Sequence, residues 1–127
     1  MTEIGQLLIK GVRECAQETP DYTYEFVKVD VYTPSGTFAY TDHHCQYMYE
    51  GQPSCIVGKA AFALGLIDAS FEFSNSNRDT IPGFVKAIGA EIDESEATWL
   101  AHVQSDQDAG ISWSEAVSEA DDDSPDL

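Results

Sequence analysis

The spacing of apolar residues near the start of the chain predicts an amphipathic helix over residues 3–17. The apolar positions in this stretch are Ile4, Leu7, Leu8, Val12 and Cys15. Residues three and four apart share one face of a helix, so these side chains form an apolar stripe. Pro20 follows closely and cannot continue the helix. We expect this stripe to cover an apolar surface elsewhere in the protein.

Alternation of apolar and polar residues next predicts a β-hairpin. Residues 27–31 read Val-Lys-Val-Asp-Val, which places the valines on one face of a strand. Pro-Ser-Gly at 34–36 is a turn sequence, and residues 37–41 supply the second strand. Residues 46–50 are a candidate third strand. Because two or three strands need a cover to be stable in water, we expect the N-terminal helix to pack on this sheet.

The second half of the chain has helical spacing. Pro53 suits a first helical turn, and Gly65 suits the left-handed residue that follows a helix. Asp93 and Glu96 have the spacing of a capping box, which starts helices. The expected helices cover residues 53–64, 81–88, 94–108 and 113–120. The predicted fold class is therefore α+β, with a small antiparallel hairpin or three-stranded sheet followed by a helical C-terminal half.

The length of 127 residues fits one globular domain, which we place at residues 1–120. Trp99 and Trp113 fall at apolar positions of the expected helices and are predicted core residues. The last seven residues, 121–127, hold four carboxylates and almost nothing to bury. We expect them to form a disordered acidic tail that adds charge repulsion and no packing.

Acidic residues are concentrated at one end of the chain. Residues 91–127 contain twelve of the 23 acidic side chains and none of the six Lys and Arg side chains. Such a field repels nucleic acid and anionic membranes and attracts basic protein surfaces. The predicted partner is therefore a basic protein surface, with no direct nucleic acid and no membrane. The residues expected to bind it are Glu94, Asp106, Asp108, Glu115 and Glu119.

Four potential metal ligands lie within thirteen residues: His43, His44, Cys45 and Cys55. Imidazole and thiolate are zinc ligands, but zinc fingers pair their ligands on tight turns at other spacings. Cys55 also falls in the first turn of a predicted helix, where the helix dipole favours a thiolate, and a nearby histidine would complete a thiol enzyme. The alternative is that both cysteines are buried apolar residues and the histidines are exposed. We favour this alternative and expect no cofactor.

A third histidine, His102, lies on the predicted helix 94–108. Its neighbours three and four residues away include Trp99 and Asp106 but no soft metal ligand. We therefore expect His102 to be a surface or half-buried residue without a site of its own.

Two segments resemble small uncharacterised proteins of actinobacterial phages and their hosts. The first is Cys45-x-Tyr47-x3-Gly51-x-Pro53-Ser54-Cys55-Ile56-Val57-Gly58, followed by Leu64-Gly65. The second is Gln104-x2-Gln107-Asp108-x-Gly110-x2-Trp113-x2-Ala116-Val117. Together the matches span residues 45–117. The resemblance implies a phage or actinobacterial setting and no particular reaction.

These features lead to one functional hypothesis and one alternative. The hypothesis is a non-enzymatic acidic binding protein, a phage accessory factor that engages a basic host protein surface, which could be one that normally holds nucleic acid. The alternative is a metal-binding or thiol-dependent enzyme centred on Cys45 and Cys55. Acidity that serves solubility alone would explain the same charge. With three cysteines and no signal-peptide pattern, we expect a cytoplasmic location, and we leave the oligomeric state open.

Overall fold

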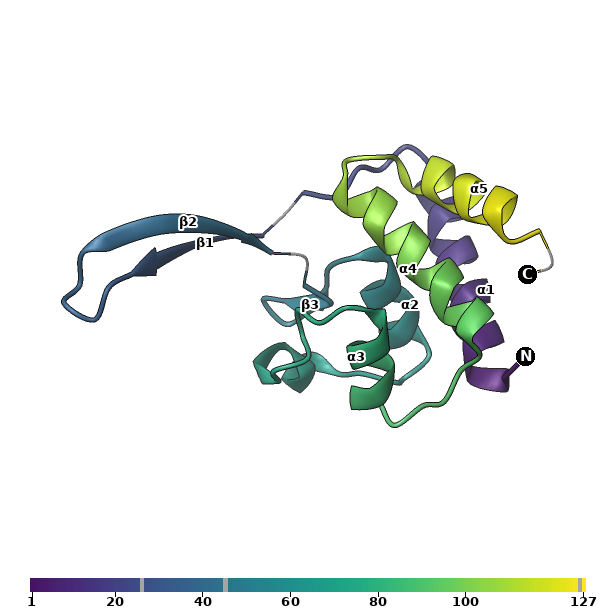
Figure 1. The fold of residues 1–127 in the computed structure, drawn as a ribbon, viewed down its shortest axis with the longest axis horizontal. Helices are drawn as coiled ribbons and strands as arrows, with labels where there is room; N and C mark the ends of the chain where they lie inside the picture. Colours follow the sequence, from purple (N-terminus) through teal and green to yellow (C-terminus); the bar gives the residue numbers. More distant parts are fainter. Residues whose placement is uncertain (26, 45, 126) are drawn as a thin grey trace.

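The residues that the computed structural model describes form five α-helices and two small antiparallel sheets, which confirms the α+β class (Figure 1). The description covers residues 1–25, 27–44, 46–125 and 127, without the side chains of residues 27–29 and 41–44. The helices are α1 (Glu3–Glu18), α2 (Ile56–Ala63), α3 (Ile81–Ala87), α4 (Glu94–Asp108) and α5 (Trp113–Asp123), with a 3-10 turn, η1 (Ala69–Phe73), before α3. The strands are β1 (Val27–Tyr32), β2 (Phe38–His44), β3 (Met48–Tyr49) and β4 (Gln52–Pro53).

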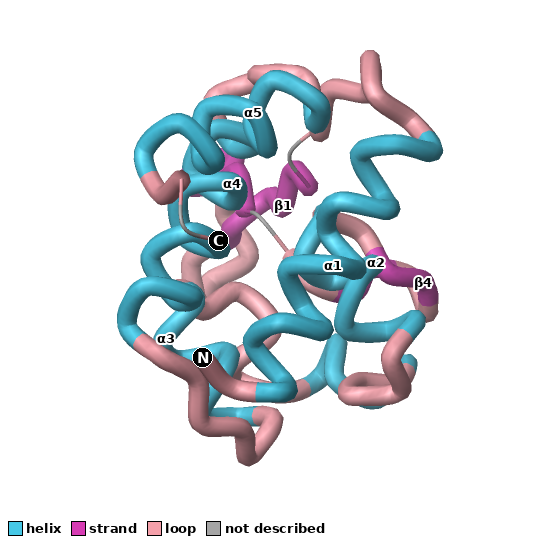
Figure 2. The backbone as a smooth tube through the Cα atoms, turned by 90° about the vertical axis from the view of Figure 1, so that its right-hand side faces the viewer, coloured by secondary structure: helices cyan, strands magenta, loops and turns pink. Residues whose placement is uncertain are grey.

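The helix α1 forms where the apolar stripe predicted it. The Thr2 hydroxyl accepts a hydrogen bond from the Gly5 backbone N–H (3.0 Å), which caps the start of the helix. Leu8, Ile9 and Val12 are buried, and α1 packs on α2, α4 and α5 (Figure 2). The expected packing of this helix on the hairpin therefore differs from the structure. The reason is that α2, which is buried over most of its residues, offers α1 the larger apolar surface.

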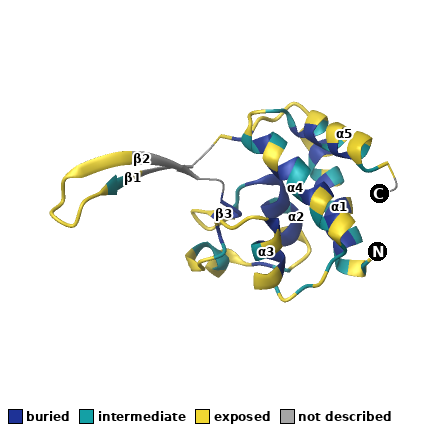
Figure 3. Cartoon of the chain, viewed as in Figure 1, coloured by how far each residue is buried: buried dark blue, intermediate teal, exposed yellow. Residues whose placement is uncertain are grey.

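The strands β1 and β2 form the predicted hairpin, which projects from the helical body at the end opposite both chain termini (Figure 1). Val31 lies opposite Tyr40, and after a bulge Tyr32 lies opposite Phe38. The side chains of Tyr32, Phe38 and Tyr40 are each more than half exposed. Most of the described hairpin is accordingly coloured as exposed in Figure 3. The hairpin is therefore an arm of the molecule and adds no layer to its core.

Residues 46–50 do not join this hairpin as a third strand. Instead, β3 pairs with β4 in a sheet of its own. Glu50 and Gly51 both have positive φ angles (51° and 79°), as in the two-residue turns that reverse a chain. On the other side of β3, the Met48 backbone N–H donates to Asn77 Oδ1 (2.9 Å), and Asn77 Nδ2 donates to the Met48 carbonyl (2.9 Å). The Asn77 side chain thus takes the place of a neighbouring strand.

The core contains both tryptophans, as predicted. Trp99 is fully buried, and Trp113 is 1% exposed. A basic side chain covers each ring: the Arg13 guanidinium carbon lies 4.9 Å from the Trp99 ring centre, and Lys59 Nζ lies 5.3 Å from that of Trp113. Each cation lies within cation–π distance of a buried indole ring.

Glu96 is a buried carboxylate that joins the start of α1 to the start of α4. It accepts hydrogen bonds from the backbone N–H (3.1 Å) and hydroxyl (2.8 Å) of Thr2 and from Gln6 Nε2 (2.7 Å). It also accepts one from the Asp93 backbone N–H (3.0 Å), which is the Glu96 half of the predicted capping box. A Cβ atom at Gly5 would overlap this carboxylate, so the contact requires glycine.

The end of the chain differs from the expected disordered tail, because α5 continues through Asp123. Arg13 Nη1 and Nη2 donate to the two carboxylate oxygens of Asp121 (2.5 and 2.6 Å), and Trp99 Nε1 donates to one of them (3.0 Å). Arg13 also donates to the backbone oxygen of Leu127 (3.1 Å), whose side chain packs on the core. The expectation was wrong here because it counted the carboxylates without Arg13, which α1 brings to them.

Candidate functional site

The helices α4 and α5 carry all five acidic residues predicted to bind a partner, but they bring only some of these together. Asp106 faces Glu119 across the two helices, and Glu115 lies one turn before Glu119 on α5. Glu94 lies in the first turn of α4, about 18 Å along the helix from Asp106. Asp108 is partly buried and accepts a hydrogen bond from the neighbouring glutamine (2.8 Å). The predicted set is therefore spread along the helices around one close group.

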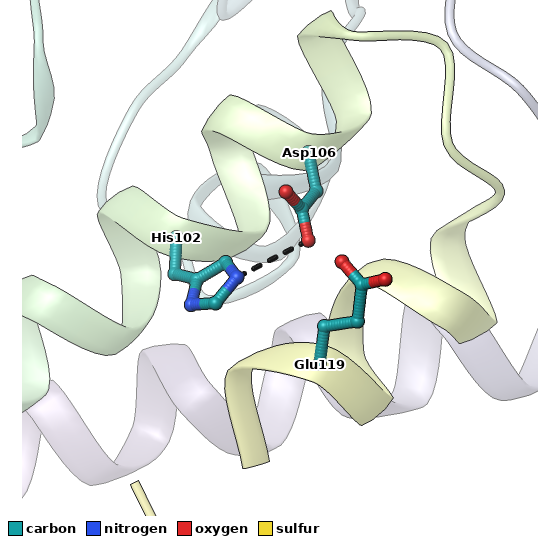
Figure 4. Close-up of side chains that lie close together, drawn as sticks. All are labelled: His102, Asp106 and Glu119. Atoms are coloured by element: carbon teal, nitrogen blue, oxygen red, sulfur yellow. Dashed lines mark ion pairs between the residues drawn. The ribbon is translucent and has the colours of Figure 1, made fainter. Parts of the chain in front are cut away.

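That close group consists of His102, Asp106 and Glu119, which we call the His–carboxylate cluster (Figure 4). His102 and Asp106 lie one turn apart on α4, and Glu119 reaches them from α5. One potential ligand atom from each side chain lies within 4.8 Å of the other two. Within the described part of the chain, no other three His, Cys, Asp or Glu side chains converge in this way. The arrangement could hold a metal ion.

Both ring nitrogens of His102 face carboxylates. Nε2 lies 3.2 Å from Asp106 Oδ2, and Nδ1 lies 3.1 Å from Asp123 Oδ2. Asp106 Oδ2 has almost no exposure to solvent and accepts no hydrogen bond, even though the ring nitrogen is close. The contact between His102 and Asp106 is therefore one of proximity without hydrogen-bond geometry.

Charge repulsion affects the protonation of the cluster. The pKa of Glu119 is raised, first by its hydrogen bond with Asp106 and by the Asp106 charge, and also by partial desolvation and by Glu115; the nearby His102 acts in the opposite direction. Two carboxylates at this distance cannot both stay ionised without cost unless a proton or a cation lies between them. The cluster therefore favours a proton or a cation between its two carboxylates.

The zinc or thiol site considered as an alternative from the sequence falls largely outside the described side chains. His43 and His44 belong to β2, but their side chains and all of Cys45 lie outside the described residues. Cys55 is described, is fully buried, and occupies the cap position of α2. The alternative of a metal or thiol enzyme stays a prediction, and Cys55 has a structural role in the fold.

The two segments that carry the resemblance meet in the core. Gln107 Oε1 accepts a hydrogen bond from the Ile56 backbone N–H (2.9 Å) at the start of α2. At the same helix end, Cys55 Sγ accepts one from the Gly58 N–H (3.4 Å). Gly58 approaches the backbone of Tyr47 so closely that a Cβ atom would overlap the Tyr47 carbonyl oxygen. These motif residues therefore build the start of α2 and do not form an exposed site.

His102 is the cluster residue for which the sequence predicted no site. Its neighbour Asp106, four residues later on the same helix face, was visible in the sequence. Glu119 lies on a different helix, and Asp123 was assigned to a disordered tail. Only the packing of α4 on α5 brings these side chains to the imidazole.

No family model, curated protein or solved structure matches this chain. None of the helices in the described residues is long and apolar enough to cross a membrane. The resemblance to actinobacterial phage proteins therefore stays a prediction.

Proposed function

We propose that this protein is a non-enzymatic binding protein that uses an acidic face on α4 and α5 to engage a basic surface of another protein. The observation that carries the proposal is the charge of residues 91–127, where twelve carboxylates have no Lys or Arg among them. The exposed carboxylates of α4 and α5, which we call the acidic face, are Glu94, Glu115, Glu119, Asp122 and Asp123.

The scaffold under the acidic face supports this proposal. Trp99 and Trp113 anchor the two helices in the core, and Asp121 ties α5 to Arg13 of α1. Carboxylates on packed helices keep their spacing before a partner arrives, so binding orders fewer groups. Complementary charge also steers a basic partner toward this face and disfavours acidic ones.

The proposed partner is a basic host protein, and the resemblance supplies the setting of a phage-infected actinobacterial cell. A protein surface that holds nucleic acid presents Lys and Arg side chains to phosphates. Carboxylates on two packed helices would occupy such a surface in place of phosphates. The protein would then compete with nucleic acid for that partner.

The test is capture of partners from an actinobacterial lysate by the full chain and by two matched variants. The face variant E94Q/E115Q/D122N removes three charges from α4 and α5 and leaves the His–carboxylate cluster intact. The control variant E3Q/E14Q/E18Q removes three charges from exposed positions on α1. We expect the face variant to lose at least about ten-fold in affinity for the captured partner, and the control to bind as the wild type does.

Salt gives a second readout for the same complex. Raising the salt from about 0.05 to about 0.5 M shortens the Debye length from roughly 14 to roughly 4 Å, so capture by the wild type should weaken steeply. Excess duplex DNA should displace the partner if the acidic face occupies a nucleic-acid site. Equal losses in both variants would show that the net charge, and not the acidic face, attracts the partner. Binding that is indifferent to salt would mean that the acidity serves solubility alone.

A further inference from the structure

We infer that His102, Asp106 and Glu119 bind one divalent metal ion of the zinc class, which joins α4 to α5. The inference does not depend on the proposed binding of a basic partner. It starts from the placement of one imidazole and two carboxylates from two helices around a common point (Figure 4).

The distances in the cluster are close to those of a metal site. A tetrahedral zinc ion with bonds of about 2.0 Å holds its ligand atoms about 3.3 Å apart. His102 Nε2 and Asp106 Oδ2 are already 3.2 Å apart, and all three potential ligand atoms lie within 4.8 Å of one another. The exposed Glu119 side chain has three rotatable bonds, so it can close the remaining gap without moving the helix.

The second observation is the group on the far side of the imidazole. Histidines that bind a metal through one nitrogen usually donate the other N–H to a carboxylate, which fixes the ring and its tautomer. His102 Nδ1 lies 3.1 Å from Asp123 Oδ2, while Nε2 faces the cluster. Asp123 is not one of the three ligands, and it comes from the part of α5 that continues beyond the expected end of the helix.

The third observation is the buried oxygen of Asp106. Asp106 Oδ2 is shielded from solvent and accepts no hydrogen bond, which leaves its negative charge poorly compensated. In a metal site, a ring nitrogen and a carboxylate oxygen lie close together without a hydrogen bond between them, as His102 Nε2 and Asp106 Oδ2 do.

The donor set selects the class of metal. One nitrogen and two carboxylate groups suit zinc and its neighbours in the first transition series. Calcium requires six to eight oxygen ligands, and magnesium keeps several of its waters and a strict octahedron. Three protein ligands also leave one position of a zinc tetrahedron for water.

Calorimetric titration of the chelator-treated full chain with Zn²⁺ near pH 7.5 tests the inference. We expect one ion per chain at this site, with Zn²⁺ bound in preference to Ca²⁺ and Mg²⁺. The ligand variants H102Q and E119Q should weaken that binding by more than roughly 100-fold, and D123N, which removes the group behind the imidazole, by about 10-fold. E115Q and D122N are matched controls, because each removes one exposed carboxylate of α5 outside the cluster, and they should change the affinity by less than about two-fold.

Cobalt replaces zinc to locate the site. Co²⁺ at His102, Asp106 and Glu119 should give visible bands without the near-ultraviolet absorption of a cobalt–thiolate bond. Thiolate absorption that persists in H102Q would place the ion at the cysteines and overturn the inference. Equal losses of affinity in E119Q and E115Q, which indicate diffuse attraction, would also overturn it. So would the absence of saturable Zn²⁺ binding. Because Glu119 is exposed, E119Q keeps the test valid even if H102Q fails to fold.

Discussion

The buried Glu96 carboxylate links the stability of the fold to pH. Burial alone would raise its pKa, but the hydrogen bonds from Gln6, Asp93 and Thr2 outweigh burial and lower the pKa from 4.5 to about 2. Because the folded state has the lower pKa, the ionised form stabilises the fold above about pH 4.5. This contribution is lost as the pH falls from there toward about 2.

We therefore expect Glu96→Gln to lower the free energy of unfolding by about 3 kcal/mol at pH 7, because an amide group would face donors that now meet a carboxylate. The difference from wild type should shrink as the pH falls toward 3. Urea denaturation at pH 7, 4 and 3 measures both quantities. Glu94→Gln, exposed in the same first turn of α4, is the control and should follow the wild-type curve. A constant difference across this pH range would contradict the argument.

Replacing Cys55 tests whether this residue has a structural role in the fold or a chemical role in the function. It is fully buried, and its sulfur caps α2 by accepting the Gly58 N–H. Cys55→Ala should therefore cost about 1–3 kcal/mol of stability and leave partner binding unchanged. Thermal melting and the capture assay measure the two effects, with the half-buried Cys15→Ala as control. Lost function at unchanged stability would instead favour the thiol-dependent alternative.

At the scale of elements, the position of α5 depends on Asp121. This carboxylate accepts hydrogen bonds from two guanidinium nitrogens of Arg13 on α1 and from the indole N–H of Trp99 on α4. The hydrogen bond and charge of Arg13, together with the hydrogen bond from Trp99, hold the pKa of the Asp121 carboxyl below its usual range. Three helices thus meet at one side chain that charge counting alone assigned to a tail.

Asp121→Asn should lower the free energy of unfolding by about 1–2 kcal/mol, a value reduced by the partial exposure of the Arg13–Asp121 pair to solvent. Asp122→Asn removes the same charge from the next, exposed position and should leave stability unchanged or slightly raised. Ending the chain at Ala120 should lower the melting temperature for the same reason. Equal melting temperatures for the two single variants would show that α5 docks without this contact.

The sequence predicted those elements that a local pattern determines. The apolar stripe of α1, the alternation at residues 27–31 and the Asp93–Glu96 spacing were sufficient to place a helix, a strand and a helix start. The pairing of β3 depends instead on the Asn77 side chain, and the extent of α5 depends on Arg13; both partners are distant in the sequence. For the candidate site, the sequence identified Asp106 and Glu119 by their charge. It did not identify His102, whose imidazole meets carboxylates of α5 only after α4 and α5 pack together.

At the scale of the whole molecule, the described side chains of the hairpin lie outside the core of the helical body. The described hairpin side chains from Asp30 to Tyr40 are exposed or half-exposed, whereas Met48, just beyond the hairpin, is fully buried. The free energy of folding therefore resides in the body. The arm contributes surface, including three exposed aromatic rings.

Replacing residues 30–41 with Asn-Gly should leave the body folded. The shortened hairpin would close between Val29 and Asp42, which are partners in the register, through a two-residue turn that Asn-Gly favours. We expect the melting temperature of this variant to change by less than about 3 °C. The control Met48→Ala should instead lower the free energy of unfolding by about 2–5 kcal/mol. A non-cooperative melting curve for the shortened chain would show that the arm supports the core.

The placement of the two tryptophans gives the molecule a selective optical probe. Both indoles belong to the helical body, on α4 and α5, with Arg13 above one ring and Lys59 above the other. The hairpin carries tyrosine and phenylalanine but no tryptophan. Light at the red edge of the absorption band excites indole and spares phenol, so the emission reports the junction of α4 and α5 alone. Trp99 lies one turn from His102 on α4. A change in its emission on adding an ion or a partner would therefore arise in the helical body, because the hairpin contributes no indole emission.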